Sequence, residues 1–409
     1  MISDVVIIGA GPAGLSAAID IAKSGASVII VDEYYRPGGR LLGQHYDDLT
    51  LKGPNKLWDG QQIAQKLTEE ARALGVKVLC GMTVWSIEGK WEIKLSGGDI
   101  SSIYCKALLV ATGAAEHALP CPGWTLPGVY SIGAAQTFTN VHHVALGKRV
   151  FVIGADPLSL SVVLEMKKAG IEVIGVALPP KSPLIERNLF SPTENVKRLT
   201  SASHLAPNLM LQKLGKLVSG RLSKMATHIL ALDFLKVEGI PLYLRKSLVC
   251  INGKEQVESV TLQNVDVDGN PNGKEIELAV DAICLSAGLY PLIDLLQAIG
   301  CPLIDIKELG GLVPLHSVDM STSIPGLFVA GNITGIEGAK VAIAQGKMAG
   351  LSILIYLQKP SKLTKEEGIE EIRRARIQSP IKFIPEIEVG RRKMEKSWTV
   401  FQQKQEVIS

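Results

Sequence analysis

The sequence contains no apolar run long enough to cross a membrane. A membrane-spanning helix needs about 18–20 consecutive apolar residues, and no segment of the 409 residues reaches that length. The N-terminus also lacks the basic region, apolar stretch and cleavage site of a signal peptide, because a strand-like run begins almost at Met1. We therefore expect a cytoplasmic protein without a transmembrane segment.

Clustered cysteines and a strong charge of one sign are absent as well. The six cysteines are scattered singly and none forms C-x-x-C, so the chain has no local signature of a redox dithiol, a zinc site or an iron–sulfur cluster. The net charge of +3 is too small to indicate binding of nucleic acid. A hydrophobic fraction of 46% indicates a core-rich chain of two or three domains, at ~150 residues each.

What the sequence does contain is a dinucleotide-binding fingerprint at its N-terminus. The apolar run 5–8 predicts a buried strand, and Gly9, Gly11 and Gly14 follow it with G-x-G-x-x-G spacing. Gly9 permits a tight turn, Gly11 leaves room for a pyrophosphate against the backbone, and Gly14 lets the next helix pack closely on the strand. The start of that helix offers free N–H groups and a positive dipole end to phosphates.

An acidic residue completes the fingerprint. Asp32 lies 23 residues after Gly9, directly after a second predicted strand at 27–31, where it can accept a hydrogen bond from a ribose. The order of strand, glycines, helix, strand and acid is far more specific than a glycine triplet alone. The sequence therefore predicts an α/β unit that binds a dinucleotide.

The opening pattern recurs near the middle of the chain. Residues 150–153 predict a strand, residues 154–159 a turn into a helix that ends at Gly170, and residues 171–176 the next strand. Residues 179–244 give no ordered assignment. Further elements are expected as a helix at 58–74, strands at 76–80, 82–87, 91–95, 103–110, 279–285 and 327–332, a hairpin of 257–262 with 274–278, a helix at 338–357, and a helix plus an arm from 361 onward.

Three signals together resemble a known superfamily: the N-terminal glycines, the Ala-Thr-Gly turn at 111–113, and Gly331-Asn332 before the last long helix. The chain resembles the two-dinucleotide-domain flavoproteins of the glutathione-reductase and thioredoxin-reductase type, the pyridine nucleotide-disulfide oxidoreductases, over about 1–358. This resemblance implies an α/β fold with two Rossmann-like domains, the second inserted into the first. The implied parts are an FAD-binding domain at 1–115 and 286–360, an inserted NAD(P)-type domain at 116–285, and a C-terminal helix and arm at 361–409.

A narrower resemblance lies in residues 111–129, 133–136 and 331–342. These stretches are similar to the large flavin subunit of opine oxidases, D-hydroxyproline and L-proline dehydrogenases, hydrogen cyanide synthase and heterotetrameric sarcosine oxidase. The resemblance implies the following FAD contacts, given in the order of the chain. They are the pyrophosphate at Gly9, Gly11, Pro12, Ala13 and Gly14, the ribose at Asp32 and Glu33, the far side of the pyrophosphate at Gly39 and Arg40, adenine at Val84, the closing turn of Ala111, Thr112 and Gly113, the ribitol at Gly331 and Asn332, and the flavin's pyrimidine edge at Gly338 and Ala339.

The sequence departs from the family pattern in ways that bear on function. Asn332 replaces the usual aspartate, which keeps hydrogen bonding but loses a charge. Asp156 and Ser159 replace two glycines of the second fingerprint, and we expect Asp156 to repel a pyrophosphate, so NAD(P), another nucleotide or no ligand all stay open there. No cysteine follows Cys301, so any iron–sulfur cluster has to come from another chain.

Other suggestive residues have plainer interpretations. We interpret His142 and His143 as a solvated or packed pair. Residues 45–48 are interpreted as a loop that lines the flavin or a partner, and not as a metal site. The basic run at 391–393 is flanked by glutamates and predicts a solvated face. The apolar residues of the tail either pack on their own domain or anchor a partner protein.

Three functions follow as hypotheses. The first is the FAD-binding electron-transfer subunit of a heteromeric amino- or imino-acid dehydrogenase or oxidase acting on CH–NH donors. Its partners would be a second, flavin-containing catalytic subunit, together with a small iron–sulfur subunit. The second is a stand-alone NAD(P)H-dependent FAD reductase, and the third is a nucleotide-binding scaffold with structural FAD. No general acid or base can be assigned.

Overall fold

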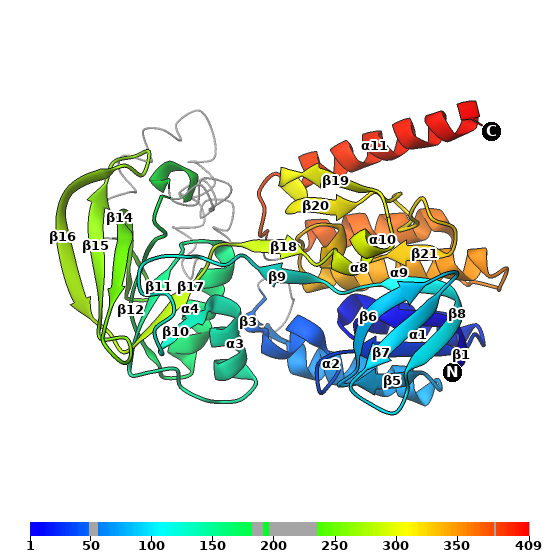
Figure 1. Ribbon diagram of the computed structural model, residues 1–409, viewed down its shortest axis with the longest axis horizontal. Coiled ribbons are helices and arrows are strands. Elements are labelled where there is room, and N and C mark those ends of the chain that lie inside the picture. The colour runs from blue at the N-terminus through cyan, green and yellow to red at the C-terminus, as the bar shows by residue number, and fades with distance from the viewer. Residues whose placement is uncertain (49–55, 182–190, 196–234, 380–381, 409) are drawn as a thin grey trace.

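The computed structural model describes residues 1–48, 56–181, 191–195, 235–379 and 382–408 (Figure 1). These residues form an α/β protein with two large sheets that lie side by side. Most of the segment 179–244, which gave no ordered assignment, lies outside the described residues. No helix among the described residues is long and apolar enough to span a bilayer.

The first sheet carries the N-terminal fingerprint. Its strand order is β5-β2-β1-β8-β7-β6, with β21 added beside β8. The pairs of β1 with β2, β1 with β8, β2 with β5 and β8 with β21 are parallel, and β6, β7 and β8 form an antiparallel edge. The bounds are β1 Ile2–Ile8, β2 Val28–Asp32, β5 Lys77–Cys80, β6 Thr83–Glu88, β7 Glu92–Ser96, β8 Ser102–Val110 and β21 Leu327–Val329.

Two helices pack on one another beside this sheet. Helix α1, Pro12–Lys23, follows β1, and helix α9, Ala339–Tyr356, comes from the far end of the chain. They approach so closely that a Cβ on Gly346 would lie 2.1 Å from the carbonyl oxygen of Ala13. Their buried apolar residues form one core with β1 and β2. Around them lie η1 Gly39–Gly43, β3 His45–Asp47, β4 Leu57–Asp59 and α2 Gly60–Ala73.

The second sheet repeats the β–α–β arrangement. Its order is β10-β17-β11-β12-β14-β15-β16, parallel as far as β14 and then antiparallel. A ribbon of β9 with β18 connects the two sheets (Figure 1). The bounds are β9 Ala114–Glu116, β10 Val129–Ser131, α3 Ile132–Asn140, β11 Arg149–Ile153, α4 Pro157–Lys168, β12 Glu172–Leu178, β13 Lys236–Val237, β14 Ile240–Asn252, β15 Ser259–Val265, β16 Pro271–Ala279, β17 Ala282–Leu285 and β18 Leu289–Pro291.

The C-terminal part packs against the first unit. Helix α11 lies along β19 and β20, and its far end carries the C-terminus (Figure 1). One helix and an arm were expected from 361 onward, but the described residues contain two helices. The bounds are α8 Asp294–Ala298, β19 Leu303–Ile306, η4 Lys307–Leu309, β20 Gly311–Pro314, η5 Asn332–Thr334, α10 Lys365–Ile377 and α11 Ile387–Ile408.

Two further expectations need correction. The helix predicted at 58–74 begins at Gly60, because Asp59 caps it by accepting a hydrogen bond from the Gln62 N–H at 3.0 Å. The strand predicted at 279–285 begins later, at Ala282, because Ala279 still belongs to β16. The break between β16 and β17 falls at Asp281, where the chain leaves its pairing with β15 and its N–H donates to the Arg149 carbonyl at 3.1 Å.

Candidate cofactor site

The N-terminus of α1 presents bare backbone. Gly11 is its N-cap, no side chain caps the helix, and a Cβ built on Gly11 would meet nothing within 4 Å. Two neighbouring glycines are needed for packing, because a Cβ would lie 2.4 Å from the Ala111 oxygen at Gly9 and 2.0 Å from the Gly9 oxygen at Gly14. Pro12 and Ala13 form the first turn. The glycines therefore bring strand and helix together and leave an open, positively polarised helix end.

Asp32 lies beside this helix end. Its carboxylate accepts hydrogen bonds from the Ala10 N–H at 2.6 Å and the Tyr34 N–H at 2.8 Å, which fix its orientation. Burial raises the pKa of Asp32, and these two backbone bonds oppose that rise. Glu33 is exposed. Val84 is half-buried in β6, which begins next to Asp32, since the Met82 N–H donates to the Asp32 carbonyl at 3.1 Å.

The predicted residues Gly39 and Arg40 lie against different parts of the structure. A Cβ on Gly39 would lie 3.1 Å from the Gly11 Cα, so this loop abuts the glycine turn. The Arg40 guanidinium instead lies toward the connecting ribbon. Its Nε donates to the Ala114 carbonyl at 3.2 Å and its Nη2 lies 3.9 Å from Glu116. A contact of Arg40 with a pyrophosphate stays a prediction.

The Ala-Thr-Gly turn joins the first sheet to the returning chain. Ala111 packs against Gly9, and the Thr112 hydroxyl donates to the Leu292 carbonyl at 2.8 Å. The Leu292 N–H donates in return to the Gly113 carbonyl at 3.1 Å. Two hydrogen bonds to Leu292, the residue after β18, therefore hold the turn in place.

A second helix of the first unit, α9, also begins without a capping side chain. Gly338 is the N-cap of α9, Ala339 is its first residue, and no side chain caps it. The turn before it touches α1, because a Cβ on Gly331 would lie 3.1 Å from the Ala13 Cβ. The Asn332 side chain accepts a hydrogen bond from the Glu337 N–H at 3.1 Å. The structure thus places the turn that precedes α9 against the first turn of α1, and neither helix has a capping side chain.

The corresponding helix of the second unit is closed. Asp156 caps α4 and accepts hydrogen bonds from the Leu158 N–H at 2.9 Å and the Ser159 N–H at 3.0 Å. The Ser286 hydroxyl donates to its other oxygen at 2.6 Å, and the Asp156 side chain is buried. The sequence predicted only repulsion of a phosphate. In the structure this carboxylate also engages the N–H groups that a phosphate would need.

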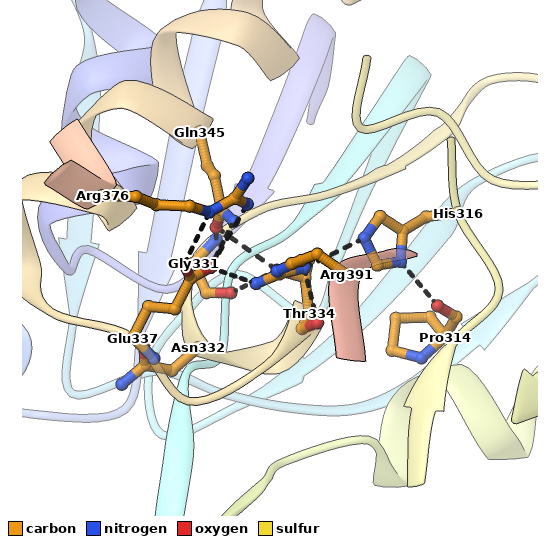
Figure 2. A network of polar contacts seen from close by, with 9 residues as sticks. All are labelled: Pro314, His316, Gly331, Asn332, Thr334, Glu337, Gln345, Arg376 and Arg391. Carbon is orange, nitrogen blue, oxygen red and sulfur yellow. Dashed lines mark hydrogen bonds and ion pairs between the residues drawn. The ribbon is translucent and has the colours of Figure 1, made fainter. Parts of the chain in front are cut away.

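A buried polar cluster was missed by the sequence interpretation (Figure 2). Arg391 was expected on a solvated face, but its residue is only 5% exposed and its guanidinium pairs with Glu337. The signal was present in the sequence, since Arg391 shares a helical stripe with Ile387, Met394 and Trp398 at spacings of four, three and four. An arginine on an apolar stripe indicates a buried partner.

A third buried carboxylate lies where the two units meet. Glu165 in α4 accepts hydrogen bonds from the Asn140 amide at 2.6 Å and the Gln136 amide at 3.0 Å. Asn140 also donates to the Gly43 carbonyl at 2.7 Å, which connects α3 to η1. Burial raises the pKa of Glu165 to about 7.

The remaining candidate groups show no catalytic arrangement. His142 and His143 are exposed. Asp48 pairs with Lys340 at 2.6 Å, and the described residues contain no cluster of three or more His, Cys, Asp or Glu suited to a metal. All six cysteines are free thiols. Burial raises the pKa of Cys105 and Cys284 to about 12 and that of Cys121 and Cys301 to about 11, which makes these four thiols unreactive.

Residues 3–346 match the family model described as pyridine nucleotide-disulphide oxidoreductase. An opine oxidase subunit of Agrobacterium tumefaciens (strain Ach5) is 28% identical over 387 residues, which cover 90% of this chain and 68% of that protein. HcnB, a hydrogen cyanide synthase subunit of Pseudomonas aeruginosa, is 27% identical, with 86% of this chain and 70% of that protein covered. The structure of L-proline dehydrogenase from P. horikoshii has a TM-score of 0.64 at 20% identity, covering 91% of this chain and 59% of that one. This last likeness shows the fold alone.

Proposed function

This chain belongs to the pyridine nucleotide-disulphide oxidoreductase family and is an FAD-dependent oxidoreductase, and we propose that it is the FAD-binding electron-transfer subunit of a heteromeric amino- or imino-acid dehydrogenase or oxidase. The proposed donors carry the C–N bond of proline, hydroxyproline, opine or sarcosine. Relatives named as subunits of opine oxidase and hydrogen cyanide synthase support this class.

The observation that carries the proposal is the open N-terminus of α1 beside Asp32. The space at Gly11 and the absence of a capping side chain fit a diphosphate held by main-chain N–H groups. Asp32 and Glu33 would bind the adenosine ribose and Val84 would meet adenine. Thr112, Gly113, Gly331 and Asn332 would border the rest of the cofactor. When bound, FAD supplies the acceptor for two electrons.

The chain's own part in this reaction is positioning and electrostatics. The uncapped end of α9 at Gly338 and Ala339 would stabilise negative charge on the flavin's pyrimidine edge. Thiol chemistry has no place in the proposal, because no two cysteines form a C-x-x-C pair. A second, flavin-containing subunit would remove hydride from the substrate, and a small iron–sulfur subunit would complete the complex.

The division of the chain into domains belongs to this proposal. The β9–β18 ribbon supports an insertion of about 116–285 into an FAD-binding domain formed by about 1–115 and 286–360. The remaining residues, 361–409, would then contribute helices outside both dinucleotide-binding folds.

A stand-alone NAD(P)H-dependent reductase is the second candidate, favoured by the repeated β–α–β arrangement of the second sheet. Asp156 argues against it, because its buried carboxylate already binds the N–H groups at the start of α4. A scaffold with structural FAD is a third candidate that the same experiment separates.

The test begins with the purified full-length chain and then uses its native complex. We expect the chain to be yellow, to release FAD on denaturation, and to keep its visible flavin band when NADH or NADPH is added. Tagging this chain should co-purify a complex that reduces an artificial acceptor with proline, hydroxyproline, sarcosine or an opine. A folded chain that is colourless and takes up no FAD refutes the proposal. Bleaching by NAD(P)H favours the reductase, and a flavin that stays oxidised during turnover favours the scaffold.

A further inference from the structure

The two C-terminal helices reach the loop in front of α9 through arginines. Glu337 immediately precedes the N-cap Gly338, and its carboxylate lies between two guanidinium groups (Figure 2). Arg376 of α10 donates from Nε to one Glu337 oxygen at 2.7 Å. Arg391 of α11 forms an ion pair with the other oxygen. Both arginines lie beyond residues 3–346, the part of the chain that matches the family model.

The same cluster holds the Gly331 turn. Arg391 donates to the Thr334 carbonyl at 2.9 Å and to the Thr334 hydroxyl at 3.2 Å. Gln345 accepts from the Gly331 N–H at 2.9 Å and donates to Glu337 at 3.3 Å. The contacts therefore bind Thr334 and Glu337 to α10 and α11, while Gln345 binds Gly331 to α9.

The buried cluster carries a net charge. Two arginines and one glutamate leave one net positive charge. His316 adds no charge, because burial lowers its pKa to about 3. Its Nδ1–H donates to the Pro314 carbonyl at 2.7 Å, and its Nε2 faces Arg391.

The neighbouring charged residues do not change the net charge of this cluster. Lys340, in the first turn of α9, is paired with Asp48 at 2.6 Å, so that pair is neutral. Glu388 also acts on Arg391 but is exposed, so solvent screens its charge.

We propose that Arg391 and Arg376 are positioning residues that place one buried positive charge behind the N-terminus of α9 and thereby stabilise negative charge on a flavin held at that helix end. This inference rests on the proposed function, in which FAD lies there. The charge adds to the positive end of the α9 dipole and acts in a water-excluded region, where its effect exceeds that of a surface charge. The C-terminal helices thus set the electron affinity of the cofactor.

Sulfite affinity and the reduction potential of the flavin-loaded chain test this inference without turnover. Sulfite adds reversibly to oxidised flavin and leaves it negatively charged, so its dissociation constant reports stabilisation of that charge. We expect Arg391→Met to weaken sulfite binding about tenfold, the effect of one partly screened unit charge. The same factor corresponds to a potential lower by about 30 mV for a two-electron couple. Arg392→Met is the matched control, since Arg392 is the next residue of α11 and is exposed.

Three more variants distinguish the effect of the buried charge on sulfite binding from the effect of a disturbed loop. Arg391→Lys keeps the charge and should restore most of the sulfite affinity. Glu337→Gln raises the net charge to +2 and should tighten sulfite binding, whereas simple loosening of the loop would weaken it. Arg376→Met changes a less buried residue and should also lower the sulfite affinity. This variant replaces Arg391→Met in the test if Arg391→Met fails to fold.

The outcomes distinguish this inference from the proposed function. A wild-type chain that takes up no FAD refutes both. Flavin-loaded Arg391→Met and Arg392→Met chains with equal sulfite affinity and equal potential refute the inference alone, as does weaker sulfite binding in Glu337→Gln.

Discussion

Gly11→Ala should weaken FAD binding by one to two orders of magnitude while leaving the fold intact. The added methyl group would meet no atom within 4 Å in the protein, and Gly11 has φ −74° and ψ −177°, a conformation open to alanine. Alanine is a poorer N-cap than glycine by about 0.5–1 kcal/mol. Alanine also lowers the conformational entropy of the unfolded chain relative to glycine, which stabilises the folded state by about 0.4–1 kcal/mol. The apoprotein should therefore melt within about 2 °C of wild type.

The loss in affinity follows from the hydrogen bonds that the methyl group displaces. A hydrogen bond from a main-chain N–H to a charged phosphate contributes about 1.5–3 kcal/mol. Losing one such bond weakens FAD binding about 10- to 150-fold. Titration of the apoprotein with FAD, followed by quenching of flavin fluorescence, measures this change.

Gly14→Ala provides the contrast. Its methyl group would lie 2.0 Å from the Gly9 carbonyl oxygen, so α1 has to move away from β1. We expect a drop in melting temperature of several degrees along with the loss of FAD, because such overpacking costs about 1–3 kcal/mol. If the Gly11→Ala apoprotein binds FAD as tightly as wild type, the assignment of the diphosphate to this helix end is wrong.

Three other predictions follow from the same structure. NADH and NADPH should leave the flavin band unchanged in stopped-flow mixing, because Asp156 occupies the N–H groups of α4; rapid bleaching would contradict this. Glu165 has a folded-state pKa of about 7, above its ordinary value of 4.5, and so binds its proton more tightly when folded. Stability should therefore fall as pH rises from about 4.5 to about 7, and thermal melts of Glu165→Gln should lack that fall. Brief alkylation of the native chain, read by mass spectrometry, should label only the partly exposed Cys80 and Cys250; labelling of a buried cysteine before denaturation would show that the core opens.

The sequence predicted the first β–α–β unit well because its determinants are local. The spacing of Gly9, Gly11 and Gly14 dictates a strand, a turn and a helix within twenty residues, and β1, α1 and β2 follow that plan. Elements that depend on distant partners were harder to predict. Strand β17 begins at Ala282 and not at 279 because the chain exchanges one neighbouring strand for another at Asp281, and no feature of residues 279–285 alone marks that position.

The candidate site shows the same contrast between features set by the local sequence and features that depend on distant residues. Main-chain features such as the open end of α1 can be inferred from glycine spacing, since the backbone itself forms the site. The roles of Arg391 and Glu337 depend on residues 54 positions apart meeting in a buried cluster. A run of basic residues flanked by glutamates is usually solvated, and only the apolar stripe around Arg391 contradicted that expectation.

Three helix N-termini of this chain differ in whether their N–H groups are free to bind an anion. Those of α1 and α9 have glycine N-caps and no capping side chain, and they lie together in the first unit. That of α4 has the same position in the second unit, but Asp156 and Ser159 cap it reciprocally and Ser286 binds the remaining oxygen. A buried carboxylate with three hydrogen bonds is costly to displace, and its charge opposes a phosphate. The protein therefore leaves the N-termini of α1 and α9 uncapped and closes that of α4, which supports the proposed flavin subunit that receives electrons from a partner and not from a pyridine nucleotide.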